Sequence, residues 1–142
     1  MKRKGFSLIE LTVVLFIILA FLAMSIPFFS GFSRTTSIKA AQREIQTVLN
    51  TARSYATAQS ANYNVVFDTA TSPQSYRITN AAGTTVGKQY PLTKGVTFGA
   101  TSTIKFAANG GLASDSPNNS VTVNGQSGSR TITVDNVTGT VQ

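Results

Sequence analysis

Residues 6–33 read FSLIELTVVLFIILAFLAMSIPFFSGFS, and this stretch decides how the rest of the chain is interpreted. Its only charged residue is Glu10, and its centre, residues 11–29, is nineteen residues long. An α-helix rises about 1.5 Å per residue, so a helix of this length reaches roughly 28 Å, close to the hydrocarbon thickness of a bilayer. The sequence therefore predicts a membrane-crossing helix over residues 6–33.

The same stretch has an alternative interpretation as a secretory signal that is removed. Such signals usually have a shorter apolar region, about 7–15 residues, followed by small residues at the cleavage point. Ala23, Met24 and Ser25 offer a cleavage point, but Pro27 and two phenylalanines follow at once. We therefore expect the segment to stay on the protein.

Glu10 is the one charged residue of this stretch, and its burial in a membrane is unfavourable. A carboxylate in an apolar helix costs about 2.5–3.5 kcal/mol at the middle of a bilayer and less near its surface. Glu10 therefore either lies among the lipid headgroups, solvated, or meets a cation of another chain when subunits come together. The residues just before it favour the second interpretation.

Those residues form a short basic leader, Lys2 to Lys4, that ends in Gly5 and is followed by Phe6 and then the apolar run. The stretch KGFSLIEL closely resembles the prepilin peptidase signature of type IV pilins and type II secretion pseudopilins. The resemblance implies that residues 1–5 are cut off after Gly5 on the cytoplasmic side and that Phe6 is then N-methylated. It also implies that Glu10 is the glutamate that these proteins carry near the start of the mature chain. The leader, and not the charge bias of the flanks, sets the expected orientation.

Cleavage after Gly5 gives the expected role of Glu10 a physical reason. The new terminal amine of Phe6 is mostly cationic at neutral pH. A neighbouring subunit displaced along a filament axis would bring its amine beside this carboxylate. The desolvation of both charges is then offset only when the subunits dock in the right register. We therefore expect Glu10 to control assembly.

Pro27 lacks a backbone donor and predicts a kink or local break in the helix. The resemblance implies that this break is a weak point that lets the stem extend during assembly. The other interpretation is that the membrane helix simply ends here, with Gly31 just beyond. We favour a helix that continues, because helical periodicity resumes downstream.

The continuation is an amphipathic helix over residues 34–61. Its apolar residues recur at helical spacing and form one stripe: Ile38, Ala41, Ile45, Val48, Leu49, Ala52, Tyr55 and Ala56. This stripe predicts packing against the remainder of the chain.

Residues 62–142 change to a period of two, which is typical of strands. Tyr63, Val65 and Phe67 alternate with their neighbours, as do Tyr76 and Ile78. Further expected strands cover residues 84–90, 96–98, 103–106, 120–124 and 130–135, with a short last one over 137–141. The fold class is therefore α+β: a long N-terminal helix, half transmembrane and half amphipathic, packed on a small antiparallel β domain, which the resemblance identifies as a pilin fold.

The composition opposes catalysis. The chain has no cysteine and no histidine, which excludes thiolate and imidazole metal sites and any triad with a histidine base. Asp115 and Asp135 have no second acid near them in sequence. Residues 109–111, Asn-Gly-Gly, predict a turn, and residues 127–129, Ser-Gly-Ser, have no base to activate a hydroxyl. We expect no enzyme, cofactor or metal site.

Three less specific sequence stretches in the C-terminal part of the chain resemble the GspH/FimT-like group of minor pilins and pseudopilins. They are ARSYATAQSANYNVVF at 52–67, IKFAANGG at 104–111 and ITVDNVTGTV at 132–141. The resemblance implies a structural subunit of a type IV pilus or a type II secretion pseudopilus. Its expected partners are other pilin subunits, a prepilin peptidase/methyltransferase, the inner-membrane assembly platform and, before assembly, membrane lipid.

The same resemblance implies a location. We expect a single pass through the inner membrane with a cytoplasmic N-terminus and a periplasmic C-terminal domain. Assembly would then move the chain into a periplasmic pseudopilus or an extracellular pilus.

Two alternatives stay open: a major pilin, and a DNA-binding pilin of a natural-transformation system. The chain carries 12 Lys+Arg against 5 Asp+Glu. Some FimT-type members bind DNA through arginines that follow a glycine near the C-terminus, whereas here Gly139 is followed by Thr-Val-Gln. The candidate cations for weak DNA or partner binding are Arg77, Lys88, Lys94, Lys105 and Arg130. Contacts to phosphates alone would make such binding strongly salt-dependent.

Overall fold

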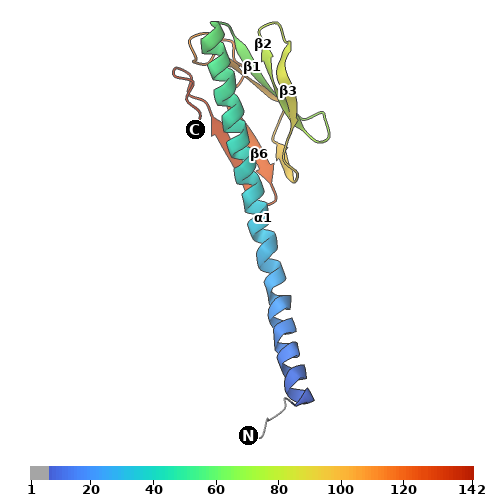
Figure 1. Ribbon diagram of the computed structural model, residues 1–142. Helices are drawn as coiled ribbons and strands as arrows, with labels where there is room; N and C mark the ends of the chain where they lie inside the picture. Colours follow the sequence, from blue (N-terminus) through green and yellow to red (C-terminus); the bar gives the residue numbers. More distant parts are fainter. Residues whose placement is uncertain (1–6) are drawn as a thin grey trace. The chain divides into compact units, whose positions relative to one another are not determined.

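The computed structural model describes residues 7–142, except for the side chains of residues 24–35. The chain divides into two compact units, Met1–Ser33 and Arg34–Gln142. Helix α1, Leu8–Gln59, contributes to both (Figure 1). The helix therefore continues past position 27. The kink predicted at Pro27 concerns a side chain outside the described ones, and it stays a prediction.

The C-terminal end of α1 is closed by the backbone. Ser60 adopts a φ of 49°, and the amide of Ala61 donates to the carbonyl of Ala56 at 3.1 Å. The amide of Ser60 donates to the carbonyl of Thr57 at 3.4 Å. These two bonds satisfy carbonyls that would otherwise lack partners at the end of the helix, and the left-handed residue turns the chain towards the first strand.

Seven strands follow and form two antiparallel sheets. Their bounds are β1 Tyr63–Asp68, β2 Ser75–Asn80, β3 Thr85–Pro91, β4 Val96–Phe98, β5 Ser102–Phe106, β6 Ser120–Gly125 and β7 Gly128–Thr133. The first sheet has the order β3-β2-β1-β5 and the second the order β4-β6-β7. Both lie along the part of α1 that belongs to Arg34–Gln142 (Figure 1). The expected α+β class, with a helix packed on an antiparallel β domain, is confirmed.

The core of Arg34–Gln142 joins the helix to both sheets. Ile45 and Leu49 of α1 are fully buried, as are Phe67 of β1, Ile104 of β5 and Ile132 of β7. Alternation explains the strand contribution, because every second residue of β1 is buried. The predicted packing of the apolar stripe is confirmed for the residues that are buried: Ile38, Ala41, Ile45, Leu49, Ala52 and Ala56.

Two sequence expectations need a correction in detail. Tyr55, placed in the apolar stripe, packs against Tyr63 with ring centroids 5.7 Å apart, but it is 38% exposed because it lies at the border between the helix and the first sheet. The last expected strand, residues 137–141, is only an isolated bridge between Val134 and Val141. The carboxylate of Asp135 accepts the amides of Val137 and Thr138, and these bonds fold the segment into a turn.

The strand expected at 130–135 instead begins at Gly128. A two-residue turn connects β6 to β7, with Gly125 opposite Gly128, so pairing begins at the turn itself.

Candidate functional site

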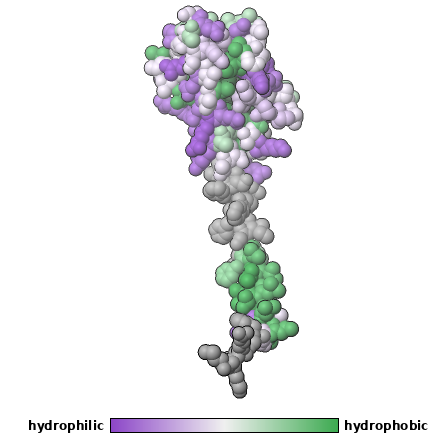
Figure 2. All heavy atoms as spheres, viewed as in Figure 1, coloured by the Kyte–Doolittle hydropathy of each residue, from purple (hydrophilic) through white to green (hydrophobic). Residues whose placement is uncertain are grey.

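The first candidate site is the exposed apolar surface of α1 in Met1–Ser33. Leu8, Phe16 and Phe21 are 81%, 74% and 69% exposed, and Figure 2 shows hydrophobic residues on this part of the helix. Soluble monomers rarely expose contiguous apolar surface of this kind without a partner that covers it. Within the described residues, no helix is long and apolar enough to cross a membrane.

Glu10 lies on this apolar surface and is exposed. Its backbone amide donates to the carbonyl of Ser7 at 3.1 Å, in the first turn of the helix. Among the side chains that the structure describes, residues 7–23 and 36–142, no ion pair involves Glu10. The carboxylate is therefore unneutralised by the described part of the chain. Gly5 and Phe6, the predicted cleavage and methylation residues, lie outside the described residues.

The five candidate cations are distributed over both sheets. Arg77 lies on β2, Lys88 on β3 and Lys105 on β5 of the first sheet. Lys94 follows β3, and Arg130 lies on β7 of the second sheet. The patch stays a prediction.

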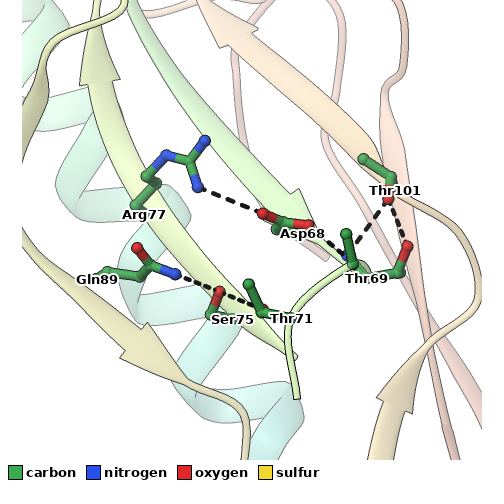
Figure 3. A network of polar contacts seen from close by, with 8 residues as sticks. Asp68, Thr69, Thr71, Ser75, Arg77, Gln89 and Thr101 are labelled. Carbon is green, nitrogen blue, oxygen red and sulfur yellow. Dashed lines mark hydrogen bonds and ion pairs between the residues drawn. The ribbon is translucent and has the colours of Figure 1, made fainter. Parts of the chain in front are cut away.

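Two of these cations have acidic partners. Arg77 lies 3.7 Å from a carboxylate oxygen of Asp68, and Figure 3 shows the pair beside the contacts of Ser75 and Gln89. Lys105 lies 2.6 Å from the carboxylate of Asp115 and donates a hydrogen bond to it, which lowers the pKa of Asp115. A cation that already neutralises a carboxylate is less available to an external anion.

Arg130 has a neutral partner, because its guanidinium donates to the side chain of Gln42 at 3.2 Å. Lys88 and Lys94 are exposed, and neither forms an ion pair within the described residues. They remain the most accessible cations of the predicted set.

The second candidate site is a groove of about 640 Å³ within Arg34–Gln142. It lies between α1 and the first sheet and includes Val48 and Tyr55 of the helix. The opposite wall is Tyr76 of β2 and Tyr90 of β3, which face each other across the strand pair with ring centroids 5.7 Å apart. Burial, followed by Glu44 and Tyr90, raises the pKa of Tyr76 to about 12, so its hydroxyl keeps its proton.

Sequence reasoning missed this groove. Tyr76 and Tyr90 belong to different expected strands, and only the register of β2 against β3 brings the rings together. The one usable signal was Tyr55, a large aromatic at the edge of a stripe whose neighbours Ala52 and Ala56 are small.

The described residues contain no cluster of three or more His, Cys, Asp or Glu side chains that would hold a metal ion. Residues 109–111 form a turn, as expected, in which the amide of Gly110 donates to the carbonyl of Ala107 at 2.8 Å. The carboxylate of Asp135 accepts hydrogen bonds within its own loop. The pKa of Asp135 is lowered by the amide and hydroxyl of Thr138 and by the amide of Val137.

Comparisons with known proteins agree with this architecture. A family profile described as the prokaryotic N-terminal methylation motif matches residues 1–26, and one described as the type II transport protein GspH matches residues 41–139. No curated protein matches the sequence.

Two crystal structures of the type IV minor pilin FimU from Pseudomonas aeruginosa PAO1 have a similar fold. One is 19% identical with a TM-score of 0.60, covering 78% of this chain and 90% of that chain. The other is 18% identical with a TM-score of 0.54, covering 73% and 90%. At these identities the likeness shows the fold.

Proposed function

Because the chain belongs to the GspH family of type II transport proteins, we propose that it is a minor pilin or pseudopilin that assembles into a filament through its N-terminal helix. The role is structural, without catalysis. The observation that carries the proposal is the joining of an N-terminal methylation motif, at residues 1–26, to a GspH-type domain in one chain.

The exposed helix surface supports assembly through α1. Large side chains such as Leu8 and Phe16 are exposed among the described residues, so a bilayer before assembly and neighbouring helices afterwards would supply apolar surroundings. Residues 6–33 are the proposed membrane and filament-core segment, and 34–61 and 62–142 form the exported domain. The chain would begin in the inner membrane, with its N-terminus in the cytoplasm, and move into the filament.

Pairing of Glu10 with a neighbouring subunit would favour one register between the subunits. Its carboxylate has no ion-pair partner among the described side chains, and its neighbours along the helix are exposed apolar residues. The amine of a neighbouring mature chain is a partner of the right charge. A charge that opposes burial in the monomer thus favours one docking position. The break at Pro27 would let the helix adapt during that docking.

Mass spectrometry of the chain purified from its host tests the proposal directly. We expect the mature protein to lack residues 1–5 and to begin with N-methylated Phe6. The matched control is Gly5→Val, which should keep the leader and stay out of filaments. A natural protein that retains Lys2–Lys4, or that begins beyond Ser25, would contradict the proposal.

DNA capture is the weaker candidate function. Arg77 and Lys105 are occupied by Asp68 and Asp115, which reduces the free positive charge of the first sheet. The segment after Gly139 carries no arginine. We therefore favour contacts with other subunits over nucleic-acid binding as the role of these cations.

A further inference from the structure

We infer that one end of the domain Arg34–Gln142, where α1 enters it, binds the headgroups of anionic lipids before the chain is assembled. This end, the basic end, comprises residues 36–44, 93–96 and 125–130. The inference rests on the proposed function, because it takes residues 6–33 as the membrane segment. It adds a lipid class and a second contact with the bilayer, made by the folded domain.

Packing brings three separate elements together at the basic end. A Cβ at Gly125, the last residue of β6, would lie only 2.6 Å from the side chain of Ile38 in α1. The same Cβ would lie 3.5 Å from the carbonyl oxygen of Gly95, just before β4. Arg130 of β7 donates to the side chain of Gln42 in α1 at 3.2 Å. The helix, the turn after β3 and the hairpin of β6 and β7 therefore meet at this end.

The basic end has an excess of positive charge. None of its cations forms an ion pair within the described side chains. Its one acid, Glu44, accepts a hydrogen bond from the hydroxyl of Thr93 at 3.2 Å. Figure 2 shows hydrophilic residues at this end of the domain. The exposed cations are Lys39, Arg43, Lys94 and Arg130.

The other acids of the domain have partners elsewhere. Asp68 lies 3.7 Å from Arg77, and Asp115 lies 2.6 Å from Lys105. The carboxylate of Asp135 accepts the amides of its own loop. The positive charge of the basic end is therefore left for an anion from outside the domain.

Chain connectivity keeps the basic end close to a bilayer. Lys39 follows Ser33, the last residue of the proposed membrane segment, by six positions, which is about 9 Å along an α-helix. This distance is close to the Debye length of about 8–10 Å at physiological ionic strength. A Lys or Arg this near an anionic surface strengthens binding about fivefold.

Tethering favours lipid over nucleic acid as the bound anion. The membrane segment holds the headgroups beside the basic end at a high effective concentration, whereas nucleic acid must arrive from solution. Lys94 and Arg130 also belong to the cations predicted to contact partners. Lipid headgroups would occupy them before assembly, and extraction from the bilayer would free them for other subunits.

The test uses the full-length chain inserted into lipid vesicles. The sequence has no cysteine, so one introduced thiol can carry one fluorophore. Ser129→Cys places it at an exposed position of β7 in the basic end, and Ala61→Cys places it beyond the opposite end of α1. Vesicles of phosphatidylcholine alone are compared with vesicles of equal parts phosphatidylcholine and phosphatidylglycerol. Both contain a quencher attached to the lipid headgroup.

We expect the quenching constant at Ser129→Cys to be at least about fivefold larger in the anionic vesicles, because several cations act together there. The constant at Ala61→Cys should be the same in both. Salt at 1 M, where the Debye length falls to about 3 Å, should remove the difference.

Substitutions identify the cations responsible. Lys39→Gln combined with Lys94→Gln should reduce the quenching at Ser129→Cys in anionic vesicles by at least about fivefold. Lys88→Gln is the matched control, because Lys88 is an exposed cation of β3 outside the basic end and has no ion pair within the described side chains. It should leave the quenching unchanged. Circular dichroism verifies that each variant remains folded.

Equal quenching of Ser129→Cys in the two kinds of vesicle, or a difference that persists in 1 M salt, would overturn the inference. So would a DNA duplex that restores the fluorescence at an equal concentration of phosphate, since nucleic acid would then be the preferred anion. Failure of the chain to insert into either kind of vesicle would instead contradict the proposed membrane segment, and this inference with it.

Discussion

Helix α1 has two halves that carry similar apolar side chains in opposite situations. Ile17 is 47% exposed, whereas Ile45 is fully buried against the strands. The first half offers apolar surface that the chain itself does not cover, and the second half finds its cover within the chain. The same residue type therefore serves folding in the second half, and in the first half it is available for the proposed association.

The difference follows from how the apolar residues are arranged. Residues 11–23 are apolar all round the helix apart from Thr12, so no arrangement of one small domain could bury every face. After residue 34, apolar residues keep to one stripe, and a single pair of sheets covers it. Amphipathicity thus separates the half of α1 that packs on the sheets from the half for which assembly is proposed.

The largest expected effect comes from one matched pair of substitutions. Ile45→Ala should lower the free energy of unfolding of the domain by about 2–5 kcal/mol, because it empties a fully buried position. Ile17→Ala should leave that free energy nearly unchanged. Urea unfolding of the full chain in detergent, followed by circular dichroism, measures both. Equal losses from the two variants would break the distinction between the halves.

An effect of comparable size, but on assembly alone, is expected at Glu10. Glu10→Gln keeps the shape but removes the charge, and losing one partner of a buried charge pair costs about 2–5 kcal/mol. Incorporation into sheared filaments should therefore fall by at least about tenfold, while membrane insertion and domain stability stay unchanged. Asp115→Asn, which removes a surface charge of the folded domain, is the control and should assemble normally. Normal incorporation of Glu10→Gln would remove the proposed assembly role.

The smallest effect concerns the pH response of the folded half. The Thr138 and Val137 donors hold the pKa of Asp135 below its usual value. The stabilisation is therefore fully present above the ordinary aspartate pKa of about 3.9 and is lost as the pH falls through the lower folded value. Asp135→Asn should unfold at a lower temperature than the natural chain at pH 6, and this difference should shrink below pH 3. A difference that persists at acid pH would show that the carboxylate charge is not what stabilises the loop.

Much of the fold followed from local patterns. The stripe that starts at Ile38 predicted the packed half of α1, and the alternation of Tyr63, Val65 and Phe67 predicted β1. These patterns are readable because a helix and a strand each repeat with a fixed period. The end of the chain was harder, since Val137 and Val141 also alternate, yet the side chain of Asp135 folds the segment into a turn.

The candidate sites divide in the same way. Gly5, Phe6 and Glu10 could be predicted from their spacing along the chain, and their roles stay predictions. The pairing of Arg77 with Asp68, and the groove lined by Tyr55, Tyr76 and Tyr90, were not. They join residues from different elements, whose register no local pattern specifies.

The sequence by itself determined the family signature, the uncovered apolar helix with its single acid, and the α+β class, because each depends on residue types at short spacing. Only the tertiary structure decided the order in which the strands form two sheets. It also decided which cations pair with an acid and where a groove opens beside α1. Those features arise from pairings between distant segments, and their geometry follows from how the whole core packs.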